Sequence, residues 1–199
     1  MTKNIITAYS LVLSVFLSTN IVVASDTISV KHDPVDHAAL NAEGISKDQP
    51  LLVKLFDTSH AKLGKAKHQD IARMLTNTAP HLLAADIVAL LRDAGFTNVL
   101  LSDFGQTPSG DYMVMDGEFT KLNPGSQAAR AWIGFGAGKS KVCVTGNIKS
   151  HSGENIASFS DCSSGLGWGV SSSQMDKDTD RIGHNIANLI ISWANGNLK

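Results

Sequence analysis

The sequence has no concentration of positive charge. Its 199 residues include 17 Lys and Arg against 18 Asp and Glu, and no basic run or stripe interrupts this balance. Proteins that bind nucleic acids or anionic lipid surfaces electrostatically carry such clusters. We therefore expect neither nucleic acid nor an anionic membrane surface as the main partner. There is no repeat of solenoid type, and the length fits one ordinary domain.

Established catalytic and metal-binding motifs are missing too. The seven histidines include no H-E-x-x-H pattern, and the serines include no G-x-S-x-G elbow. His32 and His37 flank Asp33 and Asp36, but this spacing matches no established metal site, and ligands without a fixed geometry bind weakly. We predict no metal and no cofactor; a metal chaperone that uses the two histidines is the open alternative.

The sequence identifies no catalytic residue. Carboxylates can act as general acid and base when folding brings two of them together, and four are candidates: Asp57, Asp103, Asp116 and Glu118. Nothing in their spacing brings them together, and charged side chains are usually solvated. A secreted hydrolase with such a pair is therefore the alternative function.

Charge is nearly absent from the N-terminus. Lys3 is the only charged side chain before Asp26, and the residues between them are mainly apolar and end in Val22-Val23-Ala24-Ser25. A charged start, an apolar middle and a small-residue exit are typical of a secretory signal peptide. We predict a cleaved signal over residues 1–24 and a periplasmic or secreted protein. A retained anchor is the alternative, because about 20 apolar residues can span a bilayer.

The residues after the signal show no membrane attachment in their sequence pattern and begin with a segment of mixed polarity. No cysteine lies near the exit of the signal, so a bacterial lipoprotein anchor is not available there. After Ala24 we expect no stretch that spans a membrane. Residues 25–49 mix Asp, His, Asn, Gly and Pro without sustained periodicity, which predicts a flexible lead-in.

Residues 50–199 are expected to form one α/β (α+β) domain. Apolar residues recur with helical spacing on both sides of Pro80, which should break the helix, and again in a long final helix that ends at Gly196. Strands are predicted over residues 51–57, 96–103, 112–122 (with a bulge at Gly117), 139–150 and 155–162. We therefore predict a mixed, mainly antiparallel sheet with helices packed on it.

The last two predicted strands form a β-hairpin. Alternating apolar and polar residues run up to a turn at residues 151–154, and Ser150 is expected to face Asn155. This register places Phe159 over Gly146, where an aromatic ring compensates for the missing side chain of a strand glycine.

The same register brings the only two cysteines together. Cys143 and Cys162 become opposite residues, whose Cβ atoms lie about 4.5–5.5 Å apart, close to disulfide reach. We predict a disulfide between them; two free buried thiols are the alternative. An oxidising compartment would permit the bond.

The segment GFGAGKS, from Gly134 to Ser140, raises the question of a phosphate-binding loop. Such a loop has the pattern G-x-x-x-x-G-K-[ST], but residue 133 is isoleucine where the first glycine should be. The loop should also lead into a helix that faces the anion, whereas the next residues alternate as a strand. We interpret Gly134, Gly136 and Gly138 as a structural turn.

Four residues near this turn or in the next loop are candidates for binding: Arg130, Trp132, Lys139 and Trp168. The first three, with Lys141, could hold an anionic group or a carboxyl terminus. Arg130 could instead pair with Glu118 or Asp116, and Trp132 could fill the core. Trp168 stands between two glycines and could either anchor a partner or fold back over the sheet.

The ordered series Gly117-Glu118-Phe119, Asn123-Pro124-Gly125-Ser126, Arg130 and Gly134–Ser140 resembles the bacterial envelope family catalogued as domain of unknown function 4410. The likeness spans about residues 50–195, and its specific part is residues 117–140. It implies an α/β protein of Gram-negative bacteria, secreted or lipid-anchored, with no assigned activity. The missing lipobox cysteine favours a soluble periplasmic form. A looser similarity to lipoproteins that activate peptidoglycan synthases implies a binding role.

These observations predict a non-enzymatic envelope protein. We expect it to act as an accessory factor that binds an envelope protein or a cell-wall component. The sequence predicts neither the partner nor the oligomeric state.

The predicted signal gives a simple test. Because small residues at the exit direct cleavage after Ala24, protein recovered from the periplasm should begin at Ser25 when its intact mass is measured. A mass that corresponds to a chain starting at Met1 would show that the segment is retained.

Overall fold

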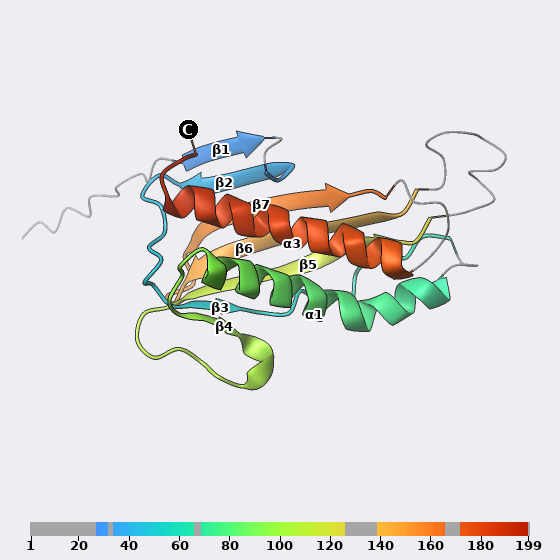
Figure 1. The fold of residues 1–199 in the computed structure, drawn as a ribbon, viewed down its shortest axis with the longest axis horizontal. Helices are drawn as coiled ribbons and strands as arrows, with labels where there is room; N and C mark the ends of the chain where they lie inside the picture. Colours follow the sequence, from blue (N-terminus) through green and yellow to red (C-terminus); the bar gives the residue numbers. More distant parts are fainter. Residues whose placement is uncertain (1–26, 32–33, 66–68, 126–138, 166–171, 199) are drawn as a thin grey trace, which may run out of the picture.

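The structure is one seven-stranded sheet with two long helices on a single face (Figure 1). The computed structural model describes residues 27–31, 34–65, 69–125, 139–165 and 172–198. The strand order is β1-β2-β7-β6-β5-β3-β4. The elements are β1 Thr27–Lys31, β2 His37–Asn41, β3 Leu51–Val53, α1 Gln69–Asp93, β4 Val99–Leu101, η2 Ser102–Phe104, β5 Met113–Asn123, β6 Lys141–Ser150, β7 Asn155–Ser163 and α3 Ser172–Ala194. The mixed sheet confirms the predicted α+β class.

A strand–helix–strand unit builds the parallel part of the sheet. β3 and β4 pair in parallel, with Leu51 opposite Val99, and α1 connects them. β5 pairs in parallel with the other side of β3. The buried residues of α1 recur at intervals typical of a helix with one face on the core: Ala72, Leu75, Ala79, Pro80, Leu83, Ala84, Ile87, Val88 and Leu91. The predicted unit is confirmed, although both of its strands are shorter than expected.

The predicted break at Pro80 is wrong, because α1 continues through this residue. A proline inside a helix has no N–H to donate to the carbonyl four residues earlier, which here belongs to Thr76. The hydroxyl of Thr58 donates to this carbonyl at 3.2 Å. The carbonyl is therefore satisfied from outside the helix, which lowers the cost of the proline.

By length and composition alone, α1 is also the one described helix that could cross a membrane. The expectation that no stretch after Ala24 is long and apolar enough to span a membrane is therefore wrong. Nine residues of α1 are buried within the domain, and α1 contacts α3, β4 and β5. Its apolar character is thus accounted for by the core of the domain.

The antiparallel part of the sheet has the predicted register at its centre. Gly146 faces Phe159 and Cys143 faces Cys162. A disulfide joins the two cysteines, whose Cα atoms are 4.1 Å apart. This bond confirms the predicted pairing.

The register changes near the hairpin turn. It shifts between Ile148 and Lys149, so that Lys149 lies opposite Asn155. The predicted pairing of Ser150 with Asn155 is therefore wrong by one residue. The N–H of Ser150 instead donates to the carbonyl of Glu154 at 2.8 Å, which closes the turn.

The irregularity of β5 lies later than predicted. Gly117 is in regular register opposite Gly146, and the shift occurs between Phe119 and Lys121. An extra residue at that point changes the alternation, so that Phe119 and Leu122 are both fully buried. Gly117 is needed for space, because a Cβ there would collide with the ring of Phe56.

The prediction of a flexible lead-in over residues 25–49 is wrong, because strands β1 and β2 occupy much of this segment. β1 pairs with β2, and β2 pairs antiparallel with β7. The side chain of Leu40 is 1% exposed, and the N–H of Asp36 donates to the carboxylate of Asp161 at 3.3 Å. Each strand has only five residues, too few to give a sustained period in the sequence.

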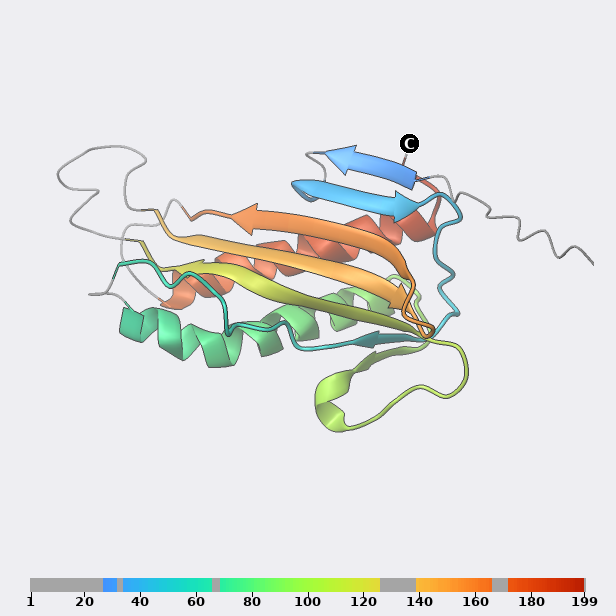
Figure 2. The same cartoon turned by 180° about the vertical axis from the view of Figure 1, so that it is seen from behind.

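The helices cover one face of the sheet and leave the other open (Figure 2). Helix α3 contacts β6 and β7, and α1 contacts β4 and β5. Strand residues alternate between the two faces: Val144 and Ile148 are buried, whereas Thr145 and Asn147 are only partly buried. The core therefore lies between the sheet and the two helices.

Replacing Gly146 with alanine should destabilise the fold. A Cβ at this position would collide with the ring of Phe159, and overpacking of a core typically costs about 1–3 kcal/mol. Urea unfolding should give that loss for Gly146→Ala and little change for Asn147→Ala, which lies on the other face. The loss should shrink when Gly146→Ala is combined with Phe159→Leu. An equal loss in both backgrounds would contradict the role assigned to the ring.

Candidate functional site

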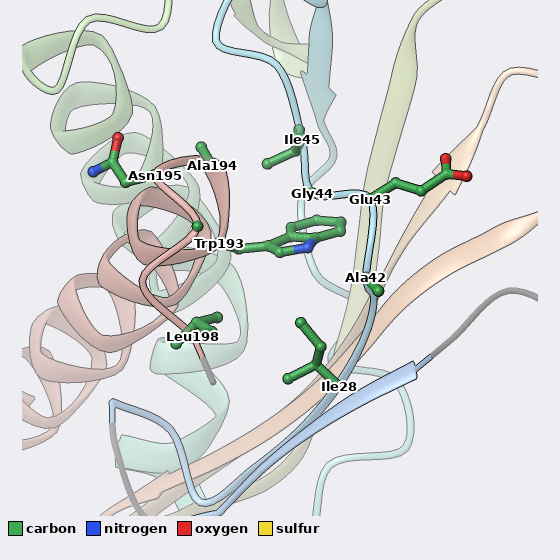
Figure 3. A pocket seen from close by; sticks show the side chains of 10 residues that line it. Ile28, Ala42, Glu43, Gly44, Ile45, Trp193, Ala194, Asn195 and Leu198 are labelled. Atoms are coloured by element: carbon green, nitrogen blue, oxygen red, sulfur yellow. The ribbon is translucent and has the colours of Figure 1, made fainter.

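A pocket of about 370 Å³ lies where the C-terminal end of α3 meets the connection between β2 and β3 (Figure 3). Three segments that are distant in the sequence form its walls: Ile28 of β1, residues 42–45, and residues 193–196 with Leu198. The side chains of Ile28, Ile45 and Leu198 supply apolar surface. Three of these lining residues, Glu43, Trp193 and Asn195, carry polar side-chain groups. The carboxylate of Glu43 and the amide of Asn195 point away from the other lining side chains (Figure 3).

Local backbone geometry shapes this pocket. Gly44 has a φ of +81°, a conformation that L side chains rarely adopt, and it lies next to the end of α3. The indole N–H of Trp193 donates to the carbonyl of Asn41 at 2.9 Å. Trp193 is only 2% exposed. The tryptophan thus joins the helix to the end of β2 and fixes the distance between the two walls.

The end of α3 beside the pocket is capped by the residues that follow it. The carbonyls of Ile191, Ser192 and Trp193 accept hydrogen bonds from the N–H groups of Asn195, Asn197 and Gly196, at 3.0, 2.9 and 3.1 Å. Glu43 is exposed at the rim. Asn41 directly precedes the residues of the pocket wall. Its Oδ1 atom is buried and accepts no hydrogen bond from the described residues. None of the described residues that line the pocket is a Lys, Arg or His.

A second polar cluster lies at the other end of α3, around the fully buried Asp178. Its carboxylate accepts hydrogen bonds from Ser140 at 2.8 Å and from Ser163 at 3.2 Å. Ser140 also accepts from the N–H of Gly165 at 3.2 Å. The guanidinium of Arg181 donates to Ser163 at 2.9 Å and lies 3.8 Å from Asp178. The cluster joins the start of β6, the end of β7 and the first turns of α3.

This cluster gives the serine of the GKS sequence a structural role. Ser140 is 1% exposed, and strand β6 begins at Lys141. The predicted change into a strand is confirmed, and no helix follows the serine as in a phosphate-binding loop. Lys139 is partly exposed beside it.

Most of the predicted binding residues lie outside the described residues. This applies to Arg130, Trp132, Trp168 and the three glycines at 134, 136 and 138. Their predicted roles stay predictions. Asp116, one suggested partner of Arg130, pairs with Lys149 at 2.8 Å.

The four predicted carboxylates do not form one site. Asp103 lies 3.2 Å from His81, and Asp116 pairs with Lys149. The backbones of Asp57 and Glu118 form an isolated parallel β-bridge. The carboxylate of Asp57, however, accepts hydrogen bonds from within its own loop. The side chain and backbone of Ser59 make these bonds and lower the pKa of Asp57. Within the described part of the chain, no group of three His, Cys, Asp or Glu side chains is placed to hold a metal ion.

One pair of carboxylates that the sequence analysis did not name does converge. Asp86 of α1 lies against Asp180 of α3, where Gly183 brings the helices close: a Cβ on Gly183 would be 3.1 Å from the Cβ of Asp86. The pKa of Asp86 is raised to about 6, first by burial and then by the charge of Asp180 and a hydrogen bond with it, while the charge of His184 opposes the shift. The Oδ2 atom of Asp86 is buried without a partner among the described residues. The pair does not line the pocket.

The pair should make stability depend on pH. The pKa of Asp86 is higher in the folded state, about 6, than in the unfolded state, about 3.8. Its contribution to the free energy of unfolding is therefore fully present below pH 3.8 and is lost as the pH rises through about 6. Asp86→Asn removes this titration and can still donate a hydrogen bond to Asp180. We expect it to raise the free energy of unfolding by about 1 kcal/mol at pH 7.5, after allowance for solvent screening, and to have no stabilising effect at pH 4.

Thermal unfolding between pH 4 and pH 8 checks this expectation. Asp111→Asn, at an exposed loop position, is the matched control and should leave the pH profile unchanged. A profile of Asp86→Asn that runs parallel to that of the unmodified protein would contradict the assignment.

Comparison with known proteins places the chain in a family. A family model described as Domain of unknown function (DUF4410) matches residues 34–178. A search of curated proteins finds no match. Similar solved structures include the PelC dodecamer from Paraburkholderia phytofirmans in space group P6, with 15% identity and a TM-score of 0.45 over 70% of this chain and 89% of that chain.

A point variant of the same dodecamer in space group C2 has 16% identity and a TM-score of 0.46 over 76% of this chain and 91% of that one. A structure described as an uncharacterized protein has 14% identity and a TM-score of 0.40 over 73% of this chain and 94% of that chain. At these values no property of those proteins is assigned to this one. Because the family model covers more than half of the sequence, the chain belongs to the family of the domain of unknown function DUF4410.

Proposed function

We propose that this protein is exported to the bacterial cell envelope and acts there by binding an envelope protein or a cell-wall component, without catalysis. The family to which the chain belongs carries no assigned activity. The proposal therefore depends on the chemistry of the chain itself.

The Cys143–Cys162 disulfide is the observation that carries the proposal. Disulfides persist in oxidising compartments such as the bacterial periplasm and are rare in cytosolic proteins. No free cysteine is found among the described residues. The predicted signal over residues 1–24 would deliver the chain to such a compartment. Both features favour the same location.

The pocket at the end of α3 supports binding rather than catalysis. General acid–base chemistry needs titratable groups within hydrogen-bond reach of a substrate. Among the described residues, Glu43 is the one titratable residue that lines this pocket. Preformed concave pockets are the usual sites of ligand binding. Asp86 and Asp180 do converge, but they lie between two helices and not at the pocket. The hydrolase alternative is therefore not favoured.

Thiol labelling tests the compartment. Protein isolated from the periplasmic fraction, denatured without reductant, should incorporate no thiol reagent, because both cysteines are bonded. The same sample should take up two labels after reduction. Two labels before reduction, or recovery of the protein in the cytosol alone, would overturn the proposal.

Site-specific photo-crosslinking in intact cells tests binding. A photoreactive residue at Ala42, on the exposed rim of the pocket, should capture a defined envelope protein or cell-wall fragment. The same residue at Ser152, in the exposed turn between β6 and β7, is the control. Equal capture at both positions would mean non-specific contact and would count against a binding site at the pocket.

A further inference from the structure

Three lysines from separate segments of the chain come together on the open face of the sheet, the face seen in Figure 2. Lys121 of β5 lies opposite Cys143 of β6, and Lys141 of β6 lies opposite Asn123 of β5. The two lysines are therefore diagonal neighbours on one face. Lys62 forms an isolated parallel bridge with Lys121 on the other side of β5. We call these three residues the lysine cluster; the sequence shows no basic run there, because the fold alone brings them together.

The irregularity of β5 turns Lys121 to this face. Met115 and Phe119 are buried on the helix side of the sheet, and unbroken alternation would turn Lys121 to the same side. The register shift between Phe119 and Lys121 adds one residue, so that Leu122 is buried instead. The bulge thus keeps Lys121 out of the core and places it beside Lys62.

Backbone contacts fix the segment that carries Lys62. Its N–H donates to the carbonyl of Thr120 at 3.1 Å, and its carbonyl accepts a hydrogen bond from the N–H of Leu122 at 3.1 Å. Two residues later, a Cβ on Gly64 would collide with the side chain of Asn123, so the segment lies directly against β5. The backbone of the lysine cluster is therefore in place before a ligand binds, which lowers the cost of binding.

No ion pair neutralises the lysine cluster within the described residues. Lys149, on the same face, does pair with Asp116 at 2.8 Å. Glu118, opposite Thr145, carries the nearest carboxylate along β5 on this face, and it forms no ion pair with the cluster. Like charges on neighbouring strands are destabilising. The cluster therefore has positive charge that an anion from outside the domain can neutralise.

We propose that the lysine cluster binds an extended acidic segment of a partner protein, with carboxylates at alternate positions. Side chains at alternate positions of an extended chain lie on the same side, about 6.6 Å apart at about 3.3 Å per residue. Diagonal neighbours on a sheet, such as Lys121 and Lys141, are about 7–8 Å apart. The surface is separate from the pocket and goes beyond the binding function proposed above.

Other anionic occupants fit this surface less well. Basic surfaces that bind membranes typically have clusters of about 4–8 Lys or Arg residues, or apolar side chains that insert into the lipid. Here the cluster has three lysines, and Met74 of α1, on the helix side, is the one exposed large hydrophobic residue among those described. A lysine ammonium is a point charge without the planar fork of arginine. Three such charges on three neighbouring segments suit several carboxylates along a chain better than one small anion.

Peptide binding to the protein purified from the periplasm tests this proposal. The acidic peptide Glu-Thr-Glu-Thr-Glu is compared with its neutral analogue Gln-Thr-Gln-Thr-Gln and with Glu-Glu-Glu-Thr-Thr, which has the same composition in another order. The readout is the fluorescence anisotropy of the labelled peptides. At low ionic strength we expect the alternating acidic peptide to bind about tenfold more tightly than the neutral one and about threefold more tightly than the reordered one. High salt should remove most of this advantage.

Variants locate the binding surface. Lys62→Gln, Lys121→Gln and Lys141→Gln should each weaken binding about threefold, and the triple variant should weaken it at least about tenfold, as expected for exposed ion pairs. The matched control Lys177→Gln removes the same charge from an exposed position of α3 and should bind like the unmodified protein. Thermal unfolding of the cluster variants should show no loss of stability, because repulsion between neighbouring lysines is relieved.

Equal binding of the acidic and neutral peptides would overturn the proposal, as would equal weakening by Lys177→Gln and by the cluster variants. Destabilised cluster variants would assign the lysines a structural role instead. Equal binding of the reordered peptide would overturn the alternate spacing. Vesicles containing phosphatidylglycerol, or a uronic-acid polymer, that bind more tightly than the peptide would identify a lipid surface or an acidic polysaccharide as the occupant. Self-association that the triple variant abolishes would identify a second copy of the chain. Each of these occupants would overturn the assignment to a partner's acidic segment.

Discussion

The fold depends on two glycines that lie side by side in neighbouring strands. Gly117 of β5 faces Gly146 of β6, and a Cβ at either position would collide with an aromatic ring, that of Phe56 or that of Phe159. The centres of these two rings are 6.3 Å apart. Because the rings lie directly on the backbone of the central strands, large apolar groups fill the middle of the core without holding the helices away from the sheet. Interiors pack as tightly as organic crystals, so neither glycine can accept a side chain without movement of a ring.

The sequence predicted the elements in which several independent signals agree. For β6 and β7, alternation over ten residues, the glycine opposite Phe159 and the two cysteines all indicated one register, and only the turn differed. Prediction failed where the deciding contact comes from far away in the chain. The carbonyl freed by Pro80 is satisfied by Thr58, and β2 is held by its pairing with β7. The pocket could not be predicted, because residues near 28, 43 and 195 meet only after folding.

The glycine-rich sequence borders a firmly anchored end of the sheet. Ser140, its last residue, is held by Asp178 on the helix side. On the other face the disulfide links β6 to β7, and Cys162 directly precedes Ser163, the second serine bound to Asp178. A covalent bond and a buried polar cluster therefore fix the same strand ends from both faces. A buried carboxylate is costly unless its hydrogen bonds are satisfied, and here both of its oxygens are engaged.

Anchoring at one end of α3 has consequences for the pocket at the other. The buried face of the helix, with Ile182, Ile186 and Ile190, is packed in the core. The pocket wall from Trp193 to Gly196 is thus fixed by contacts that a ligand does not have to create, and the indole bond to Asn41 sets the opposite wall. Preorganisation of this kind removes much of the entropic cost of binding.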